Sequence, residues 1–95
     1  MSYKLTFHPK ALKEFKKLNS SFREQFKKKL ESRLENPKVS KDKLSAYDNV
    51  YKIKLRTVGY RLAYKVLDKE ILIIVLAVGQ RKNSKIYKLL QAREK

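Results

Sequence analysis

Two alternating stretches separated by a glycine-containing turn constrain the fold of this chain more than any other feature. In Tyr51–Arg56, apolar residues alternate without a break with Lys, Lys and Arg, and Tyr60–Val66 also alternates. A period of two places successive side chains on opposite faces of a strand. Gly59 lies between the stretches and can adopt a positive φ, which favours a tight turn. The segment therefore predicts a hairpin with one apolar face and one face that carries cations.

Two further segments have strand patterns. Tyr3–Phe7 alternates apolar and polar residues, as in a short strand, and Ile71–Val78 is apolar throughout, as in a strand covered on both faces. Asp68–Glu70 is expected to form a tight turn before the apolar strand, and Gly79 is expected to end it. Together with the hairpin, these segments predict a sheet of four strands.

Two helices are expected between the first strand and the hairpin. Pro9–Leu18 carries apolar residues at helical spacing, and Pro is favoured at a first helical position because its missing N–H would be unpaired there. Ser21 and Glu24 match a capping box, which would start the second helix, and Asn36 with Pro37 would end it. The apolar stripe of the second helix consists of Phe22, Phe26, Leu30 and Leu34.

A short C-terminal helix is expected over residues 83–95, with Asn83 or Ser84 as its N-cap. Its few apolar anchors, Ile86, Leu89 and Leu90, predict a mobile element. The order of strand, two helices, three strands and one helix is typical of the α+β class. We therefore expect a compact single domain over residues 1–95. A mostly antiparallel four-stranded sheet would carry the N-terminal helical hairpin on one face and leave the other partly open.

The charge of the chain limits its partners. Its 95 residues include 25 Lys and Arg against 9 Asp and Glu, a formal net charge of +16. An excess of this size on a small domain is typical of proteins that bind a polyanion, most often nucleic acid. Binding to a membrane surface and a genome that favours Lys codons are the alternatives. An apolar content of 42% supports a packed core rather than a disordered tail.

The sequence favours a cytoplasmic location. The chain has no Cys, and therefore neither a disulfide framework nor thiolate chemistry. Its first ten residues lack the apolar core of a secretion signal. The longest apolar run, Ile71–Val78, has 8 residues, far fewer than the about 20 that a membrane helix needs. We expect no membrane partner.

The cationic face of the hairpin is the candidate site. Lys52, Lys54 and Arg56 share one face of the first strand, a tight hairpin would bring Arg61 beside them, and Arg81 follows the last strand. Any one of these residues alone is typical of a solvated strand face, where Lys also discourages edge aggregation. The set is more informative, because no Asp or Glu alternates with it between residues 51 and 61. We expect four or five cations to converge there.

These cations limit the chemistry that the face can perform on RNA. Cleavage needs the 2′-hydroxyl deprotonated, the phosphorane charge stabilised and the 5′-oxygen protonated. The single His, His8, lies at a strand–helix junction and is interpreted as a capping or surface residue, and no metal-ligand spacing occurs. Neighbouring cations would lower the pKa of a Lys from about 10.4, whereas bound RNA would raise it again. Positioning of the RNA and stabilisation of the phosphorane charge would then contribute more to the cleavage rate than proton transfer.

Tyr87 on the expected C-terminal helix has two interpretations. Its ring could stack on an RNA base, a contact worth about 1–3 kcal/mol. Alternatively, it packs on the sheet with Ile86 or Leu90, as aromatic residues of amphipathic helices commonly do.

The chain resembles the RelE-type toxins of bacterial toxin–antitoxin pairs, in the ribosome-dependent branch of the RelE/ParE superfamily. The matching residues lie in order along nearly the whole chain: "LKEFKKL" (12–18), "YKIKLR" (51–56), "GYRLAYKV" (59–66) and "VGQRKNSKIY" (78–87). The resemblance implies a compact fold of the microbial ribonuclease kind. It also implies an endoribonuclease without cofactor or metal, which cleaves mRNA in the ribosomal A site to a 2′,3′-cyclic phosphate and a 5′-hydroxyl.

The resemblance assigns roles to individual residues. Lys52 and Lys54 match the basic strand pair, with Lys54 the better candidate for the general base. Arg61 matches the arginine that stabilises the phosphorane, and Arg81 matches a general acid or charge stabiliser. Tyr87 matches the tyrosine that stacks on the mRNA base and orients the 2′-hydroxyl. The expected RNA-binding residues are Lys52, Arg56, Lys82 and Tyr87.

The chain departs from the family pattern at Gln80, where many members carry Lys, and in the more basic loop "RKNSK" (81–85). Neither departure changes a proposed catalytic position. The superfamily also includes gyrase inhibitors without nuclease activity, so a non-catalytic toxin or a basic RNA-binding module is the alternative function.

The resemblance also implies partners. The +16 charge would dock on the rRNA of the 70S ribosome while the cationic face takes A-site mRNA. An acidic, RelB-like antitoxin would wrap the protein with an amphipathic helix, and displacement of the C-terminal helix is one route to inhibition. Operator DNA would be bound only indirectly, through the antitoxin.

Overall fold

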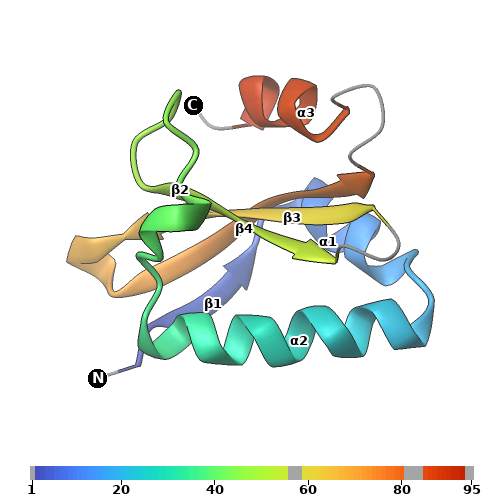
Figure 1. Ribbon diagram of the computed structural model, residues 1–95, viewed down its shortest axis with the longest axis horizontal. Helices are drawn as coiled ribbons and strands as arrows, with labels where there is room; N and C mark the ends of the chain where they lie inside the picture. The colour runs from blue at the N-terminus through green and yellow to red at the C-terminus, as the bar shows by residue number, and fades with distance from the viewer. Residues whose placement is uncertain (1, 56–58, 81–84, 94–95) are drawn as a thin grey trace.

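The computed structural model describes residues 2–55, 59–80 and 85–93 and has the expected α+β architecture (Figure 1). Its elements are β1 (Lys4–Phe7), α1 (Pro9–Lys16), α2 (Ser20–Glu35), a 3-10 turn (Ser40–Asp42), β2 (Val50–Leu55), β3 (Tyr60–Leu67), a second 3-10 turn (Asp68–Glu70), β4 (Leu72–Gln80) and α3 (Lys85–Arg93). Within these ranges, none of the helices is both long and apolar enough to cross a bilayer.

The four strands form one mixed sheet in the order β1-β4-β3-β2. The β2–β3 and β3–β4 pairs are antiparallel, which confirms the hairpin and the mostly antiparallel sheet. β1 lies parallel to β4, with Phe7 opposite Val75. The register is interrupted once, because Ala63 pairs with Ala77 whereas Tyr64 pairs with Val75, so β4 contains one extra residue, Leu76. Such a bulge bends and twists the strand.

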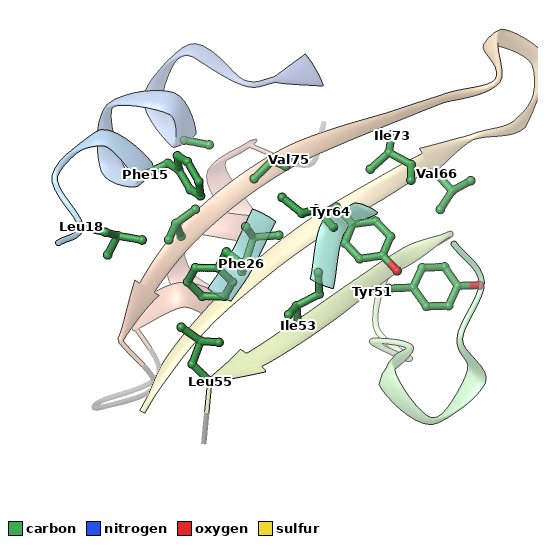
Figure 2. Packing of buried hydrophobic residues seen from close by; sticks show 14 residues of the cluster. Phe15, Leu18, Phe26, Tyr51, Ile53, Leu55, Tyr64, Val66, Ile73 and Val75 are labelled. Carbon is green, nitrogen blue, oxygen red and sulfur yellow. The ribbon is translucent and has the colours of Figure 1, made fainter. Parts of the chain in front are cut away.

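The main core lies between one face of the sheet and the two N-terminal helices, as expected (Figure 2). The helices contribute Ala11 and Phe15 from α1 and Phe26 and Leu30 from α2, all of them buried. Burying each large apolar side chain contributes about 1.5–3 kcal/mol before entropy is counted. The sheet contributes Tyr51, Ile53, Leu55, Leu62, Tyr64, Val66, Ile73, Val75 and Val78.

The start of α2 differs from the predicted one. α2 begins at Ser20, and the Asn19 side chain is its cap, accepting a hydrogen bond from the Phe22 N–H at 2.9 Å. The predicted Ser21–Glu24 capping box is therefore wrong, because Asn19 already satisfies a free N–H of the first turn. Pro9 at the start of α1 is confirmed, and the His8 Nδ1 caps that helix by accepting from the Lys10 N–H.

β4 also differs from its predicted ends. It runs to Gln80 rather than ending at Gly79, since Gly79 is still paired with Arg61 of β3. At its start, Ile71 has a φ of +49° and caps the 3-10 turn, so it lies outside the strand and is 37% exposed rather than buried.

The second face of the sheet carries a smaller apolar cluster beneath α3 (Figure 1). Ile86 and Leu90 of α3 are buried there, as expected, and Leu89 packs against the edge of the cluster. The sheet side of the cluster is formed by Val50, Ala63, Leu76 and Ala77. This face is therefore only partly open, and α3 borders the remaining part.

Candidate active site

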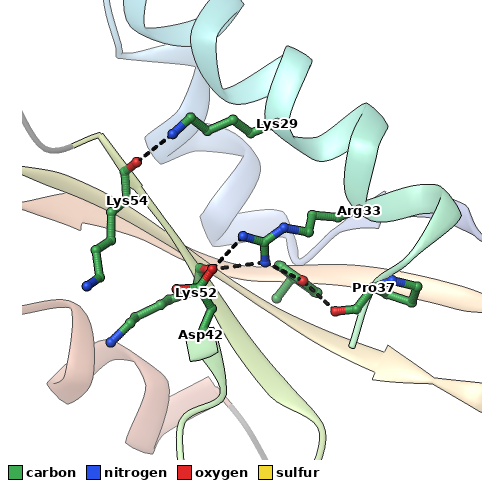
Figure 3. A network of polar contacts seen from close by, with 7 residues as sticks. Lys29, Arg33, Pro37, Asp42, Lys52 and Lys54 are labelled. Carbon is green, nitrogen blue, oxygen red and sulfur yellow. Dashed lines mark hydrogen bonds and ion pairs between the residues drawn. The ribbon is translucent and has the colours of Figure 1, made fainter. Parts of the chain in front are cut away.

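β2 presents its two lysines on the face opposite α2. Lys52 and Lys54 alternate with Tyr51, Ile53 and Leu55, which are buried in the main core. Both lysine side chains run away from Lys29 and Arg33 of α2, toward the face that α3 borders (Figure 3). The alternation in the sequence thus correctly predicted which side chains face the core and which form a cationic row.

Arg61 joins this row across the hairpin. Lys54 is its direct cross-strand partner, and on its other side Arg61 pairs with Gly79 of β4. Side chains of directly paired residues lie on the same face, so Lys54 and Arg61 are neighbours. Gly79 adds no side chain, and a Cβ built at this position would meet nothing within 4 Å. The row therefore ends beside an open stretch of backbone.

Tyr87 brings α3 into the same site. The Arg61 Nη1 donates a hydrogen bond to the Tyr87 hydroxyl at 2.6 Å, across 26 residues of sequence. The Tyr87 ring is half-buried against the cluster beneath α3. The packing interpretation is therefore confirmed, and the hydroxyl also reaches the cationic row, whereas stacking of the ring on an RNA base stays a prediction. Lys54, Arg61 and Tyr87 form one continuous arrangement.

Three predicted site residues lie outside the described residues. Arg56 directly follows β2, and Arg81 and Lys82 directly follow β4. Their assigned roles stay predictions.

A network behind β2 was not predicted from the sequence (Figure 3). The Arg33 guanidinium donates to the Lys52 carbonyl at 3.3 Å, to the Tyr64 hydroxyl at 2.8 Å and to the Asp42 carboxylate at 2.6 Å. One turn earlier on α2, the Lys29 Nζ donates to the Lys54 carbonyl at 3.1 Å. These contacts hold the backbone of both candidate catalytic lysines from the side opposite their ammonium groups.

Burial and neighbouring charges shift the pKa values of two groups in this network, Arg33 and Tyr64. Burial alone would lower the pKa of Arg33, but hydrogen bonds and charges from Tyr64 and Asp42 outweigh it and raise that pKa above its ordinary value. Burial raises the pKa of Tyr64, against the opposing effect of Arg33. Tyr64 therefore stays protonated and donates to the Pro37 carbonyl at 2.6 Å. One sequence feature could have indicated this network: Lys29 and Arg33 are four residues apart, which places both on one face of α2.

Comparisons with known proteins decide the family. A family model described as ParE toxin of type II toxin–antitoxin system, parDE, matches residues 5–84. The chain is also 48% identical over 87 residues to the mRNA interferase toxin RelE of Escherichia coli strain K12, covering 92% of each protein. The chain belongs to the RelE-type toxins of the ParE/RelE superfamily.

Solved structures of RelE-type toxins share the fold of this one. A free double arginine-to-alanine variant of Escherichia coli RelE matches with a TM-score of 0.90 and 44% identity over 97% of each chain. The toxin in the intact Escherichia coli RelBE toxin–antitoxin complex matches with a TM-score of 0.84 and 46% identity, covering 86% of this chain and all of that one. The expected RelE fold is therefore confirmed.

Acidic and imidazole side chains are dispersed in this RelE-type toxin. Across residues 2–55, 59–80 and 85–93, no three His, Asp or Glu side chains gather in a way that could hold a metal ion. His8 is occupied as a helix cap, and Asp42 is paired with Arg33. The groups that gather around Arg61 are instead cationic or phenolic.

Proposed function

We propose that this RelE-type mRNA interferase, the toxin of a type II toxin–antitoxin system, cleaves messenger RNA in the A site of the ribosome. Lys52, Lys54, Arg61, Arg81 and Tyr87 would form its active site. The observation that carries the proposal is the Arg61–Tyr87 hydrogen bond beside the Lys54–Arg61 cross-strand pair, because it joins three assigned residues from three elements.

Each group has a distinct task in the proposed reaction. Lys54 removes the proton of the 2′-hydroxyl, and the 2′-oxygen attacks phosphorus. The bond from phosphorus to the 5′-oxygen breaks, and that oxygen takes a proton from Arg81 or from water. The products are a 2′,3′-cyclic phosphate and a 5′-hydroxyl, and no metal is needed to balance the step.

Charge stabilisation is the larger contribution in this proposal. Arg61 is fixed by its contact with Tyr87 and can therefore face the phosphorane without reorganising during the reaction. The Tyr87 ring would stack on a base and align the 2′-hydroxyl with the phosphorus. Lys52, Arg56 and Lys82 would bind the flanking phosphates, which accounts for like charges kept side by side on one strand.

The ribosome and an antitoxin are the proposed partners. A net charge of +16 distributed over the surface suits docking on ribosomal RNA, a polyanion much larger than the cleaved strand. The solved complex of the related Escherichia coli toxin with its antitoxin supports a RelB-like antitoxin for this chain. Binding to operator DNA would occur only through that antitoxin.

Primer extension on ribosome-bound mRNA tests the proposal. A stop within the A-site codon is expected with the native chain and is expected to disappear in Arg61→Ala. Stalled translation with an uncut template would instead support a non-catalytic toxin or RNA-binding module.

Single-turnover cleavage as a function of pH, measured for Lys52→Met and Lys54→Met, tests which lysine is the general base. Loss of the acidic limb of the profile, over which the rate rises with pH as the base loses its proton, is the expected result in Lys54→Met alone.

A further inference from the structure

A partly buried ion pair joins α3, near the end of the chain, to α1, near its start. Arg93, the last residue of α3, donates through both terminal nitrogens to the two carboxylate oxygens of Glu14 on α1, each at 2.8 Å. The Arg93 side chain is only 8% exposed and the Glu14 side chain 25%. A bidentate pair of this kind fixes orientation as well as distance.

The same two side chains satisfy backbone groups at the edge of β4. The Val78 N–H donates to Glu14 at 3.1 Å, and the Leu76 carbonyl accepts from Arg93 at 3.1 Å. β1 ends at Phe7, opposite Val75, so in the described pairing β4 has no neighbouring strand on this side beyond that point. The extra residue Leu76 lies at this point. Glu14 and Arg93 therefore take the place of a missing strand and at the same time attach α3.

α3 depends on such attachments for its position. It has nine residues, and an isolated helix of this length is unstable in water. Ile86 and Leu90 bury its apolar side, and the pair at Arg93 fixes its last turn. Tyr87 lies six residues before Arg93, or about 9 Å along the helix axis. A rotation or tilt of α3 after loss of the pair would therefore move the Tyr87 hydroxyl away from Arg61.

We propose that Glu14 and Arg93 are positioning residues for the cleavage reaction: they hold α3 so that Tyr87 stays against Arg61. The proposal rests on the proposed function, in which Tyr87 and Arg61 act on the RNA. Neither Glu14 nor Arg93 would touch the substrate. Misplacing reacting groups by about 1 Å can lower a rate about 100-fold. We expect Arg93→Ala to reduce single-turnover cleavage about tenfold to a hundredfold at saturating ribosome concentration.

A double-mutant cycle tests whether the pair acts through Tyr87. Arg93→Ala is measured in the native background and in Tyr87→Ala, on ribosomes carrying a defined A-site codon. The proposal predicts that the loss seen in the native background largely disappears when Tyr87 is absent. Equal losses in both backgrounds would overturn it, because Arg93 would then act independently of Tyr87. Arg93→Lys, which keeps the charge but not the bidentate contact, should recover part of the rate.

Hydrogen exchange of the free protein provides a readout that needs no activity. Amides of α3 should lose protection in Arg93→Ala, while those of α2 keep it, and unchanged α3 protection would overturn the proposal. If the native chain fails to cut ribosome-bound mRNA, the proposed function is refuted, and this measurement still decides whether the pair holds α3 in place. Glu24→Gln, which removes an exposed ion pair with Lys27, is the control and should change neither readout.

A second variant distinguishes the loss of α3 positioning from misfolding of the whole domain. Arg93→Ala leaves the Glu14 carboxylate half-buried without its partner, which can destabilise the whole domain. Glu14→Gln/Arg93→Met removes both charges at similar volume. It should retain the melting transition of the domain and still lose cleavage and α3 protection. Native cleavage together with native α3 protection in this double variant would also overturn the proposal.

Discussion

Replacing Arg33 with methionine tests how strongly the network behind β2 stabilises the strand that carries the candidate catalytic lysines. The side chains of Arg33 and Asp42 are each 14% exposed and lie 2.6 Å apart, so Arg33→Met would leave a nearly buried carboxylate unpaired. Removing one partner of a buried pair costs about 3–5 kcal/mol, and we take the lower end because both groups retain some contact with water. A loss of about 3 kcal/mol corresponds to a fall of about 12–24 °C in Tm for a domain of this size.

Urea unfolding followed by circular dichroism measures this change. The midpoint should fall while the slope stays constant, since the surface exposed on unfolding is unchanged. Arg33→Met/Asp42→Asn should lose less stability than Arg33→Met alone, because no charge is then left unpaired. The exposed-pair variant Glu24→Gln should change stability by less than about 0.5 kcal/mol. A loss below about 1 kcal/mol in Arg33→Met would refute the argument that this network holds β2.

Four further variants test other parts of the structure. Tyr87→Phe removes the acceptor of the Arg61 hydrogen bond and should lower single-turnover cleavage about tenfold to a hundredfold; an unchanged rate would show that the contact is not used. Gly79→Ala should stabilise the fold by about 0.4–1 kcal/mol in urea unfolding, whereas Gly59→Ala, at a φ of +68°, should destabilise it. The hydrogen bond from Lys38 lowers the pKa of Asp68, so Asp68 stabilises the fold above about pH 4 and this contribution is lost as the pH falls through its lowered pKa. The urea midpoint should therefore fall less between about pH 6 and pH 2 in Asp68→Asn than in the native chain, and equal falls would contradict this.

Local patterns were sufficient to predict the elements and the cationic row. Alternation in β2 and β3 determined which side chains face the core, and a two-strand hairpin leaves few choices of register. For this reason the Lys54–Arg61 neighbourhood could be expected from the sequence. The resemblance to RelE-type toxins, rather than the spacing, assigned Tyr87 to the same site.

Long-range polar contacts could not be predicted in this way. Arg33 and Glu14 look like ordinary surface charges of amphipathic helices. Only the folded chain brings Arg33 against Tyr64 and Asp42, and Glu14 against Arg93 at the edge of β4. The capping error at Ser21 has a similar origin, because Asn19 and Ser21 both suit a helix start and the chain entering from α1 decides between them. The predicted mobility of α3 was based on its apolar residues alone and did not include Arg93.

The parallel pairing of β1 with β4 has a consequence for biosynthesis. Lys4 pairs with Leu72, and Glu14 pairs with Arg93, so the contacts along the β1 side of β4 form only when nearly all of the chain is available. Contacts between residues far apart in the sequence form slowly, because a long loop must close before they can form. A chain that lacks the residues of α3 therefore also lacks the contact between Tyr87 and Arg61 in the candidate active site. In the proposed function, cleavage would therefore begin only after α3 has docked on the sheet.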